Sequence, residues 1–526
     1  MSYAAKMNRS AVWAALAAVL ALVAAAPPAL AAVDAVKLRQ GALQGAAMGD
    51  VIAFKDIPYA APPVGDLRWR PPQAPAPWTG VRKAEAFGPA CIQPASPNRP
   101  LLATSEDCLT LNVWTPATRP AGAKLPVMVW IHGGAFVYGT ASTPFYDGTR
   151  FARDGVVLVS LNYRLGRFGF FAHPALTAAD PSGPLGNYGL MDQIAALNWV
   201  KANIAAFGGD PTNVTIFGES AGAMSVNYLM VSPMARGLFS KAISESGFGR
   251  VAGSAIRGAA DSAEAVGSKV AEGLGVKGGD AAALAALRAL PAEKLNAAPT
   301  GLSDPTIPSP MIDGVVVPQS VPAAFAAGHQ AKVPFLQGGN SWEASLFPKI
   351  RQDPEATLTK AGPLRGALIA LYGGPGDLAK VAMDVTTDAA VTEPDRFLAR
   401  QMVKAGVPAF VYFFSYVPAP QRAGMPGAPH GGEIMYVFDN LPEAPISFGA
   451  YKIPAATPDD AKIAQAMHAY WVVFARTGDP GGAGGVAWPR FDARSEPVLE
   501  FGADGVRVRP EFRKARLDAV AAAAKP

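Results

Sequence analysis

Val214-Thr215-Ile216-Phe217-Gly218-Glu219-Ser220-Ala221-Gly222-Ala223 is the stretch around which the chain is organised. Its first four residues are apolar or β-branched and predict a buried strand, and the alanine-rich run after the motif favours a helix. A G-x-S-x-G motif between a strand and a helix indicates a nucleophile elbow, a sharp turn that lifts a serine Oγ clear of the sheet. Gly218 and Gly222 leave room where larger side chains would collide. The pattern predicts that Ser220 is a nucleophile.

Regular elements on both sides of the elbow predict a parallel α/β sheet. Strands are expected at residues 125–131 and 156–161. A helix is expected at residues 187–207, where apolar side chains recur at spacings of three and four. Strand, helix, strand, elbow and helix in this order indicate a right-handed parallel arrangement. The later elements are expected at residues 333–336 (strand), 408–416 (strand) and 461–475 (closing helix).

Two regions depart from this pattern. Residues 33–90 contain many prolines and short β segments, such as residues 51–54, and predict an antiparallel edge at the start of the sheet. Residues 250–300 are rich in Ala and Gly with weak helical periodicity. We expect inserted helices there, over the sheet edge and flanking the site, with low complexity from a biased composition as the alternative.

Residues 1–31 are typical of a leader and not of the fold. Lys6 and Arg9 form a short basic start, an apolar, mostly alanine run follows, and residues 29–31 match an A-x-A cleavage pattern. A membrane anchor is the alternative, but the run is shorter than the ~20 residues that a span usually needs. We therefore expect an exported protein, periplasmic or secreted, with residues 32–526 as one domain and no stable membrane span.

Composition limits the remaining classes. The chain has 526 residues, of which 50% are hydrophobic and 17% charged, and these values are typical of a globular protein. A formal net charge of +5, with scattered charges, does not favour a nucleic-acid partner. Cys91 and Cys108 in an exported chain indicate one disulfide. We find no metal-binding, dinucleotide or phosphate-loop signature, and so expect no metal and no cofactor.

An activated serine needs a base and an acid. His430 is the best placed of five histidines, because it lies in a loop beyond the strand at 408–416, although a surface histidine is the alternative. The acid should lie between Ser220 and His430 in the chain. Glu343 follows the strand at 333–336 by a short glycine-rich loop, whereas Asp313 before Gly314 is more typical of a turn. Position alone leaves the choice between the two acids open.

The loop His132-Gly133-Gly134-Ala135 directly follows the strand at 125–131. This is the place of an oxyanion loop, in which small residues let backbone N–H groups point at a developing negative charge. The N–H of Ala221, just after the elbow serine, would be a third donor. An ordinary Gly-Gly turn after a strand is the alternative.

With these motifs the chain resembles the type-B carboxylesterases, the esterase and lipase family that includes the cholinesterases. The resemblance covers nearly all of residues 35–510. It rests on an opening signature at 54–65, a cysteine motif at 105–113, a serine motif at 217–222 and a histidine motif at 430–438. It implies an α/β-hydrolase fold, with a mostly parallel central sheet, flanking helices and inserted helical segments, and hydrolysis of carboxylic esters.

The resemblance also implies residue roles. It assigns Ser220 as nucleophile, Glu343 as acid and His430 as base, and it places Ser246 near the acid. The oxyanion donors carry over to Gly134, Ala135 and Ala221; the family often has a third glycine where this chain has Ala135, whose methyl group is expected to narrow the acyl side. The remaining correspondences are structural: the Cys91–Cys108 disulfide and the ion pairs Arg68–Glu106 and Arg164–Asp192.

The loop between the two cysteines narrows the expected substrate. Residues 92–107 contain no Trp, Tyr or Phe, which argues against the aromatic recognition of choline. The loop is also short compared with the lid of the related fungal lipases. We expect a broad esterase for small or medium acyl groups. The alternatives are a specialised detoxifying ester or amide hydrolase and a non-catalytic adhesion-type homologue, although an adhesion protein predicts a broken triad.

Overall fold

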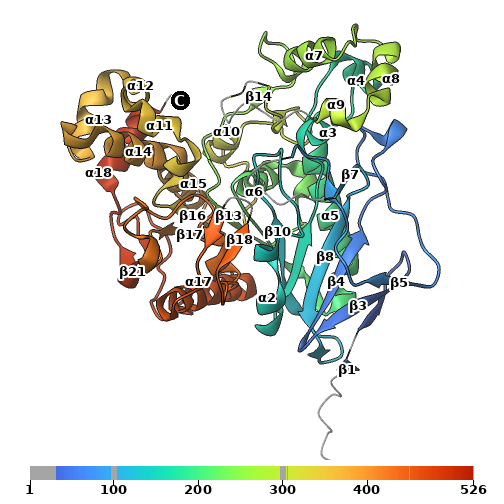
Figure 1. Ribbon diagram of the computed structural model, residues 1–526, viewed down its shortest axis with the longest axis horizontal. Helices are drawn as coiled ribbons and strands as arrows, with labels where there is room; N and C mark the ends of the chain where they lie inside the picture. Colours follow the sequence, from blue (N-terminus) through green and yellow to red (C-terminus); the bar gives the residue numbers. More distant parts are fainter. Residues whose placement is uncertain are drawn as a thin grey trace, which may run out of the picture.

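A long twisted sheet with helices on both faces forms the centre of the computed structural model (Figure 1). The structure describes residues 31–32, 34–95, 103–296, 304, 306–448 and 451–524. The predicted leader, residues 1–31, therefore lies almost entirely outside the described residues. Among those that are described, no helix has the length and apolar character needed to cross a membrane.

The central sheet is parallel in the middle and antiparallel at its edges. Its strands, in spatial order, are β2 (Ala35–Lys37), β3 (Ala42–Met48), β4 (Val51–Pro58), β8 (Thr110–Pro116), β11 (Val157–Leu161), β10 (Leu125–Ile131), β12 (Gly209–Glu219), β13 (Lys241–Glu245), β16 (Phe335–Asn340), β17 (Ala409–Phe414), β20 (Val498–Gly502) and β21 (Gly505–Arg509), with β5 (Val81–Ala84) beside β3. The strands from β11 to β20 run parallel. Both the predicted antiparallel opening edge and the predicted α/β-hydrolase fold are confirmed.

The side chains of β10 explain why the middle strands are continuously apolar. Val127, Val129 and Ile131 pack in one core, on the face covered by α5 (Tyr188–Asn203). Met128 and Trp130 pack in a second core on the opposite face. That face is covered by α2 (Thr149–Arg153), α16 (Ile434–Val437) and α17 (Pro458–Thr477). A parallel strand that is covered on both faces has no polar side to alternate with an apolar one.

Two groups of helices lie away from the sheet. One consists of α7 (Ala263–Gly273), α8 (Ala281–Ala289) and α9 (Ala292–Leu295), which lie together near α4 (Pro174–Ala179) (Figure 1). These helices confirm the helical prediction for residues 263–295, whereas residues 250–262 contain the short strand β14 (Ser254–Ala255) and no helix, and residues 297–300 lie outside the described part. The other group, which the sequence analysis did not predict, consists of α11 (Lys349–Gln352), α12 (Pro354–Thr359), α13 (Arg365–Leu371), α14 (Leu378–Thr387) and α18 (Lys514–Ala523).

The predicted loop before Glu343 is wrong in part, because β16 continues through Gly338 and Gly339 to Asn340. A Cβ on Gly338 would lie 2.3 Å from the carbonyl oxygen of Tyr412, and one on Gly339 would lie 2.3 Å from Cγ1 of Val391. The two glycines therefore let neighbouring groups approach a central strand closely. Only residues 341 and 342 separate this strand from Glu343.

Other boundaries shift by a few residues. The helix predicted at 187–207 is α5 followed by a 3₁₀ turn, η3 (Ile204–Phe207). The closing helix α17 begins earlier than predicted because Thr457 and Asp460 form a capping box, and it ends before Gly478 at φ +79°. Between α14 and α15 (Glu393–Lys404) the chain forms a π-helical turn, η8 (Asp388–Thr392), behind the carboxyl end of β16.

Candidate active site

Ser220 lies at the sharp turn between β12 and α6 (Ala221–Val231), with φ +57° and ψ −122°. Its N–H donates a hydrogen bond to the carbonyl of Glu245, 2.9 Å away on the neighbouring strand. A Cβ on Gly218 would lie 2.5 Å from the carbonyl oxygen of Ile131, and one on Gly222 would lie 1.9 Å from the same atom. Both glycines of the motif are therefore required for the elbow to pack on β10, as the sequence predicts.

The loop after β10 lies directly against this elbow. A Cβ on Gly133 would lie 3.0 Å from Cβ of Ser220. Gly134 has φ +112°, and Ala135 and Phe136 follow at φ +56° and +60°. Left-handed backbone at non-glycine residues is strained and is often found at functional sites. The predicted oxyanion loop and Ala221, the first residue of α6, thus meet beside Ser220.

Glu343 and His430 are brought together by two neighbouring loops at the carboxyl end of the sheet. His430 Nδ1 lies 2.5 Å from Glu343 Oε2, and the Glu343 carboxylate is fully buried. Its Oε1 accepts hydrogen bonds from Ser246 Oγ at 2.6 Å and from the N–H of Asn340 at 2.7 Å. The carboxylate is therefore fixed in a geometry that orients the imidazole through its Nδ1–H.

The other nitrogen of His430 faces the elbow. Nε2 lies 2.9 Å from Oε1 of Glu219, the residue that immediately precedes Ser220. Burial by itself lowers the pKa of His430, but the Glu219 and Glu343 carboxylates outweigh burial and raise this pKa well above its usual value of 6.5. Ser220 Oγ makes no hydrogen bond to a described residue, and catalytic hydrogen bonds often form only when substrate is bound.

Hydrogen bonds join the two loops that carry Glu343 and His430. Ser345 Oγ accepts the backbone N–H of His430 at 3.0 Å. Ser341 Oγ accepts the N–H of Ala428 at 2.8 Å, and the N–H of Trp342 donates to the Ala428 carbonyl at 2.9 Å. The positions of the acid and of the histidine are therefore coupled by backbone contacts as well as by their own side chains.

Two more buried carboxyl groups, which the sequence analysis did not assign, lie close enough to Glu219 to interact with its charge. Glu433 Oε2 accepts a hydrogen bond from Asn340 Nδ2 at 2.5 Å, and Glu245 Oε1 accepts one from Trp471 Nε1 at 2.8 Å. Burial, then the charges of Glu219 and Glu343, raises the pKa of Glu433 to about 8. Burial and then Glu433 raise the pKa of Glu245 well above its usual value.

An aromatic ring borders the site. Phe248 is partly exposed, and its ring centroid lies 5.9 Å from that of His430. It follows Ser246 by two residues, and both have left-handed backbone, at φ +47° and +57°. The Phe248 ring therefore packs beside the imidazole.

The other sequence-predicted residues lie outside this centre. Asp313, the rival acid, accepts the N–H groups of Val315 and Val317 at 3.1 and 2.8 Å, which is the turn that its sequence favours. The structural pairs form as the resemblance implies: Cys91–Cys108 is a disulfide with a Cα–Cα distance of 5.0 Å, Arg68 pairs with Glu106 at 2.5 Å, and Arg164 pairs with Asp192 at 2.7 Å. Of the remaining histidines, His132, His173 and His468 are buried elsewhere and His329 is exposed.

The sheet order, the serine elbow and the buried Glu–His pair define an α/β-hydrolase of the serine hydrolase class. Within that class, the chain belongs to the carboxylesterase family, whose model matches residues 32–362 and 373–520. It is a carboxylic-ester hydrolase, and enzymes of this family work through a serine acyl-enzyme.

Individual relatives support this assignment over most of the chain. A fumonisin B1 esterase of Sphingopyxis macrogoltabida is 37% identical over 488 residues, which cover 90% of this chain and 88% of the relative. Carboxylesterase 1D of Rattus norvegicus is 35% identical, with 86% of each chain covered. The solved carboxylesterase EST55 of Geobacillus stearothermophilus superposes with a TM-score of 0.80 at 35% identity and covers 93% of this chain and 100% of its own.

Proposed function

We propose that Ser220, His430 and Glu343 carry out the ester hydrolysis. Ser220 Oγ attacks the ester carbonyl while His430 Nε2 takes its proton, and Glu343 stabilises the imidazolium that forms. The backbone N–H groups of Gly134, Ala135 and Ala221 bind the oxyanion. In this proposal these groups carry out every step, and neither a metal ion nor an organic cofactor takes part.

The second half of the reaction reuses the same groups. His430 gives its proton to the departing alcohol, and the acyl group remains on Ser220. A water molecule, deprotonated by His430, then attacks the acyl carbonyl and releases the acid. The observation that carries this proposal is the buried Glu343–His430 contact of 2.5 Å, with Nε2 facing the residue that precedes Ser220.

The first test is hydrolysis of p-nitrophenyl butyrate by the purified protein and by Ser220→Ala. We expect rapid release of nitrophenolate by the wild type and a loss of at least about 10⁴-fold in the variant, because removing one triad member leaves little beyond binding. Stoichiometric labelling of the wild type by a small organophosphonate, absent in Ser220→Ala, identifies the nucleophile. An active Ser220→Ala variant contradicts the assignment.

We further propose that the enzyme prefers soluble esters with small or medium acyl groups. Two features support this preference: the resemblance, which places the Ala135 methyl group on the acyl side, and the Phe248 ring, whose centroid lies 5.9 Å from that of His430. A series of p-nitrophenyl esters from acetate to palmitate tests this preference, and higher kcat/KM for emulsified long-chain triglyceride than for soluble esters contradicts it. One relative is named for fumonisin B1, so that compound and an amide analogue belong in the panel; activity restricted to either favours the specialised detoxifying or amide hydrolase.

We infer that the protein is exported, to a periplasm or to the outside of the cell. The leader-like residues 1–31 support this, and the Cys91–Cys108 pair fits an oxidising compartment. Cell fractionation with and without residues 1–31 tests the inference. The inference is contradicted if the expressed chain stays in the cytosol and mass spectrometry shows that it still carries residues 1–31.

A further inference from the structure

Asp395 is a fully buried acid without a partner. It lies in the first turn of α15 with 1% of its surface exposed. Neither of its carboxyl oxygens has a hydrogen-bond partner among the described residues. Its backbone is fixed, because its carbonyl accepts a hydrogen bond from Gln337 Nε2 at 2.8 Å. Burying an unpaired acid is costly, and natural proteins tolerate such local conflicts mainly at functional sites.

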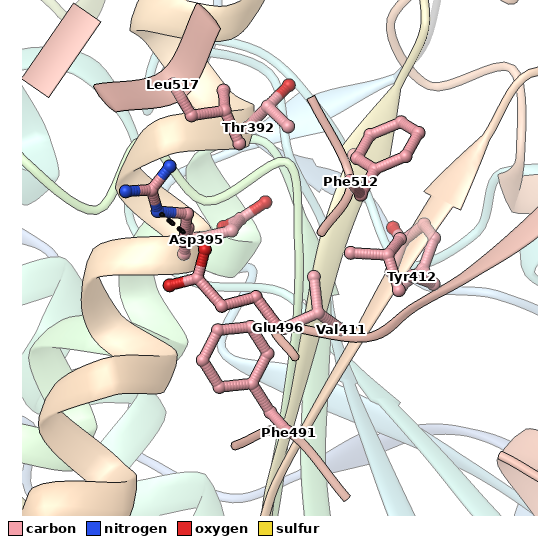
Figure 2. Close-up of a pocket in the computed structure, with 11 residues that line it drawn as sticks. Thr392, Asp395, Val411, Tyr412, Phe491, Glu496, Phe512 and Leu517 are labelled. Carbon is pink, nitrogen blue, oxygen red and sulfur yellow. Dashed lines mark ion pairs between the residues drawn. The ribbon is translucent and has the colours of Figure 1, made fainter. Parts of the chain in front are cut away.

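The carboxyl group of Asp395 lines a small internal cavity between α15 and the carboxyl half of the sheet (Figure 2). The lining includes five apolar side chains, Val411, Phe491, Val498, Phe512 and Leu517. Its polar members are Thr392, Tyr412 and the ion pair Arg396–Glu496, and the backbone of Gly339 also borders it. Because none of these groups hydrogen-bonds the Asp395 carboxyl group, the cavity favours the neutral, protonated acid.

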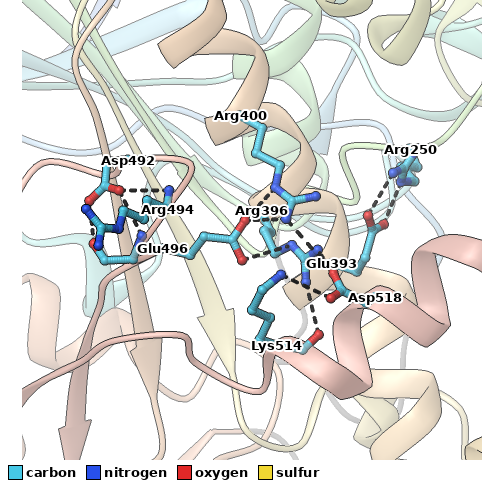
Figure 3. A network of polar contacts seen from close by, with 10 residues as sticks. Arg250, Glu393, Arg396, Arg400, Asp492, Arg494, Glu496, Lys514 and Asp518 are labelled. Carbon is cyan, nitrogen blue, oxygen red and sulfur yellow. Dashed lines mark hydrogen bonds and ion pairs between the residues drawn. The ribbon is translucent and has the colours of Figure 1, made fainter.

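Three arginines on or beside α15 are bound to acids other than Asp395 (Figure 3). Arg396, which also lines the cavity, lies 3.6 Å from Glu496 and pairs with Asp518. Arg400 Nε donates to Glu496 at 2.5 Å. Arg250 makes two hydrogen bonds to Glu393, at 2.5 and 2.7 Å. None of these three arginines forms an ion pair with Asp395 in the described structure, although Arg396 Nε has no hydrogen-bond partner of its own.

A single glycine lies between this cavity and the Glu343 carboxylate. Gly339 lines the cavity, and a Cβ on Gly339 would lie 3.0 Å from Glu343 Oε1. Burial first, and then the charges of Glu343 and Glu393, raise the pKa of Asp395 well above its usual value of 3.8. Interactions between titrating groups are reciprocal, so an ionised Asp395 would in turn strengthen the hold of the Glu343–His430 pair on its proton.

We propose that Asp395 is a positioning residue for the reaction, which acts on His430 through Glu343. In its neutral form it leaves Glu343 as the acid that sets the basicity of the imidazole. When it ionises at alkaline pH, its charge keeps the proton on His430 and lowers activity. This inference rests on the proposed roles of Ser220, His430 and Glu343.

Charged and titrating groups lie near Asp395 on several packed elements. They are Glu393 and Arg396 on α15, Glu343 on the loop after β16, Tyr412 on β17 and Glu496 on the segment before β20. Arg396 and Glu496 neutralise each other, and burial raises the pKa of the Tyr412 phenol well above its usual range. Within this set, burial raises the pKa of Asp395, so Asp395 ionises at a higher pH than an ordinary aspartate. Glu433, whose pKa burial raises to about 8, also interacts with Glu343 and is unchanged in the variants tested below.

The test compares wild type with Asp395→Asn, which keeps the shape and cannot ionise. The readout is the ratio of kcat/KM at pH 9.5 to kcat/KM at pH 7, measured on a soluble ester with the spontaneous hydrolysis subtracted. We expect kcat/KM of the wild type to be at least about fivefold lower at pH 9.5 than at pH 7. In the variant the two values should agree within about twofold. A fivefold fall in Asp395→Asn as well, or no fall in the wild type, overturns the proposal.

Asp388→Asn is the matched control. Asp388 is also fully buried and lies seven residues earlier, but it is paired with Arg513 at 2.7 Å and with Tyr372 at 2.8 Å. A residue with a purely structural role should lower the melting temperature and leave the pH ratio at its wild-type value. If Asp388→Asn also abolishes the fall in kcat/KM between pH 7 and pH 9.5, the effect arises from stability and the proposal fails.

A second readout does not require catalysis. Because the folded-state pKa of Asp395 is raised, wild-type stability is complete below the unfolded pKa and is lost as pH rises toward the folded pKa. The melting temperature of Asp395→Asn relative to wild type should therefore increase from pH 4 to pH 9. If Asp395→Asn does not fold, Asp395→Leu takes its place with the same expectations. If the Ser220 assignment is wrong, Ser220→Ala will remain active. The melting curves do not depend on that result.

Discussion

Acidic side chains are arranged in opposite ways around His430 and around helix α18. Around His430, the carboxyl groups of Glu219, Glu245, Glu343 and Glu433 gather with no Lys or Arg paired to any of them in the described structure. Around α18, Asp388, Glu496 and Asp518 are each paired with an arginine, and the last two pairs are drawn in Figure 3. The excess of acids raises the proton affinity of the first cluster, whereas the balanced second cluster holds a terminal helix in place.

The largest expected effect comes from breaking the cluster around His430 at its acid. Glu343→Gln keeps the volume but removes the charge that stabilises the imidazolium. We expect kcat/KM to fall by about 10³- to 10⁴-fold, as for loss of the acid in other triads, with little change in KM. Steady-state kinetics on p-nitrophenyl butyrate measure the loss, with Ser220→Ala as the inactive reference. A loss of less than tenfold would show that another group serves as the acid.

The balanced cluster should respond in stability and not in chemistry. Asp388→Asn removes the charge that pairs with the Arg513 guanidinium, 23% exposed, and leaves one acceptor oxygen where Arg513 and the Tyr372 hydroxyl now use two. We expect the free energy of unfolding to fall by about 3 kcal/mol, typical of a broken buried pair. Urea unfolding measures it. The kcat/KM of the folded fraction should remain within about twofold of wild type, and a larger change would mean that the two clusters are coupled.

The parts of this comparison that the sequence could predict are the local ones. The strand at 125–131, the elbow and the oxyanion loop are contiguous segments. Their conformations can be predicted from the apolar runs and glycines within each segment, and β10 has its predicted bounds. Cys91, Cys108, Arg68 and Arg164 were placed by resemblance and find their expected partners. The glycines of β16 misled the prediction, because glycine in a strand and glycine in a loop have the same local signal.

The contacts that define the site electrostatically could not be predicted. Glu245 and Glu433 come from segments far apart in the chain, and only the fold places both near the imidazole. Glu219 stands inside the serine motif, so it was visible, but its contact with His430 depends on where the histidine loop lies. Asp395 has no sequence signal at all, since an acid in the first turn of a helix normally favours the helix N-terminus and faces solvent.

A smaller effect is expected when the cluster around His430 loses one of its two flanking charges. Glu219→Gln should lower the pKa of His430, because the Glu219 carboxylate is one of the two charges that raise it. The fall of kcat/KM on the acid side should move to lower pH with this pKa, raising activity at pH 5.5 relative to pH 8. An unshifted fall would mean that Glu219 does not contact the imidazole in the working enzyme.

The same variant has a stability signature with a definite sign. Because the folded-state pKa of His430 is raised, the stabilisation by Glu219 is fully present below the unfolded pKa of histidine, about 6.5, and is lost as pH rises through the folded pKa. Glu219→Gln should therefore lower the melting temperature most at acidic pH and least at alkaline pH. A uniform loss at every pH would indicate lost packing and not a lost charge.

The smallest effect is expected at Ala135, an uncharged residue whose methyl group we propose to narrow the acyl side of the site. Glycine relieves the left-handed strain at φ +56°, worth about 1 kcal/mol, but it also frees the unfolded chain by a similar amount. The free energy of unfolding of Ala135→Gly should therefore change by less than about 1 kcal/mol. Removing the methyl group should raise kcat/KM for p-nitrophenyl octanoate relative to butyrate by about threefold to tenfold, the range of one or two carbon groups in an apolar pocket.

Ala141→Gly is the matched control for this change, because Ala141 is 2% exposed and lies six residues further along the same segment, outside the loop beside Ser220. Its ratio of octanoate to butyrate activity should equal that of the wild type. If Ala135→Gly also keeps the wild-type ratio of octanoate to butyrate activity, the Ala135 methyl group does not face the acyl chain. The width of the site would then have to be set by Phe248, whose ring lies beside that of His430.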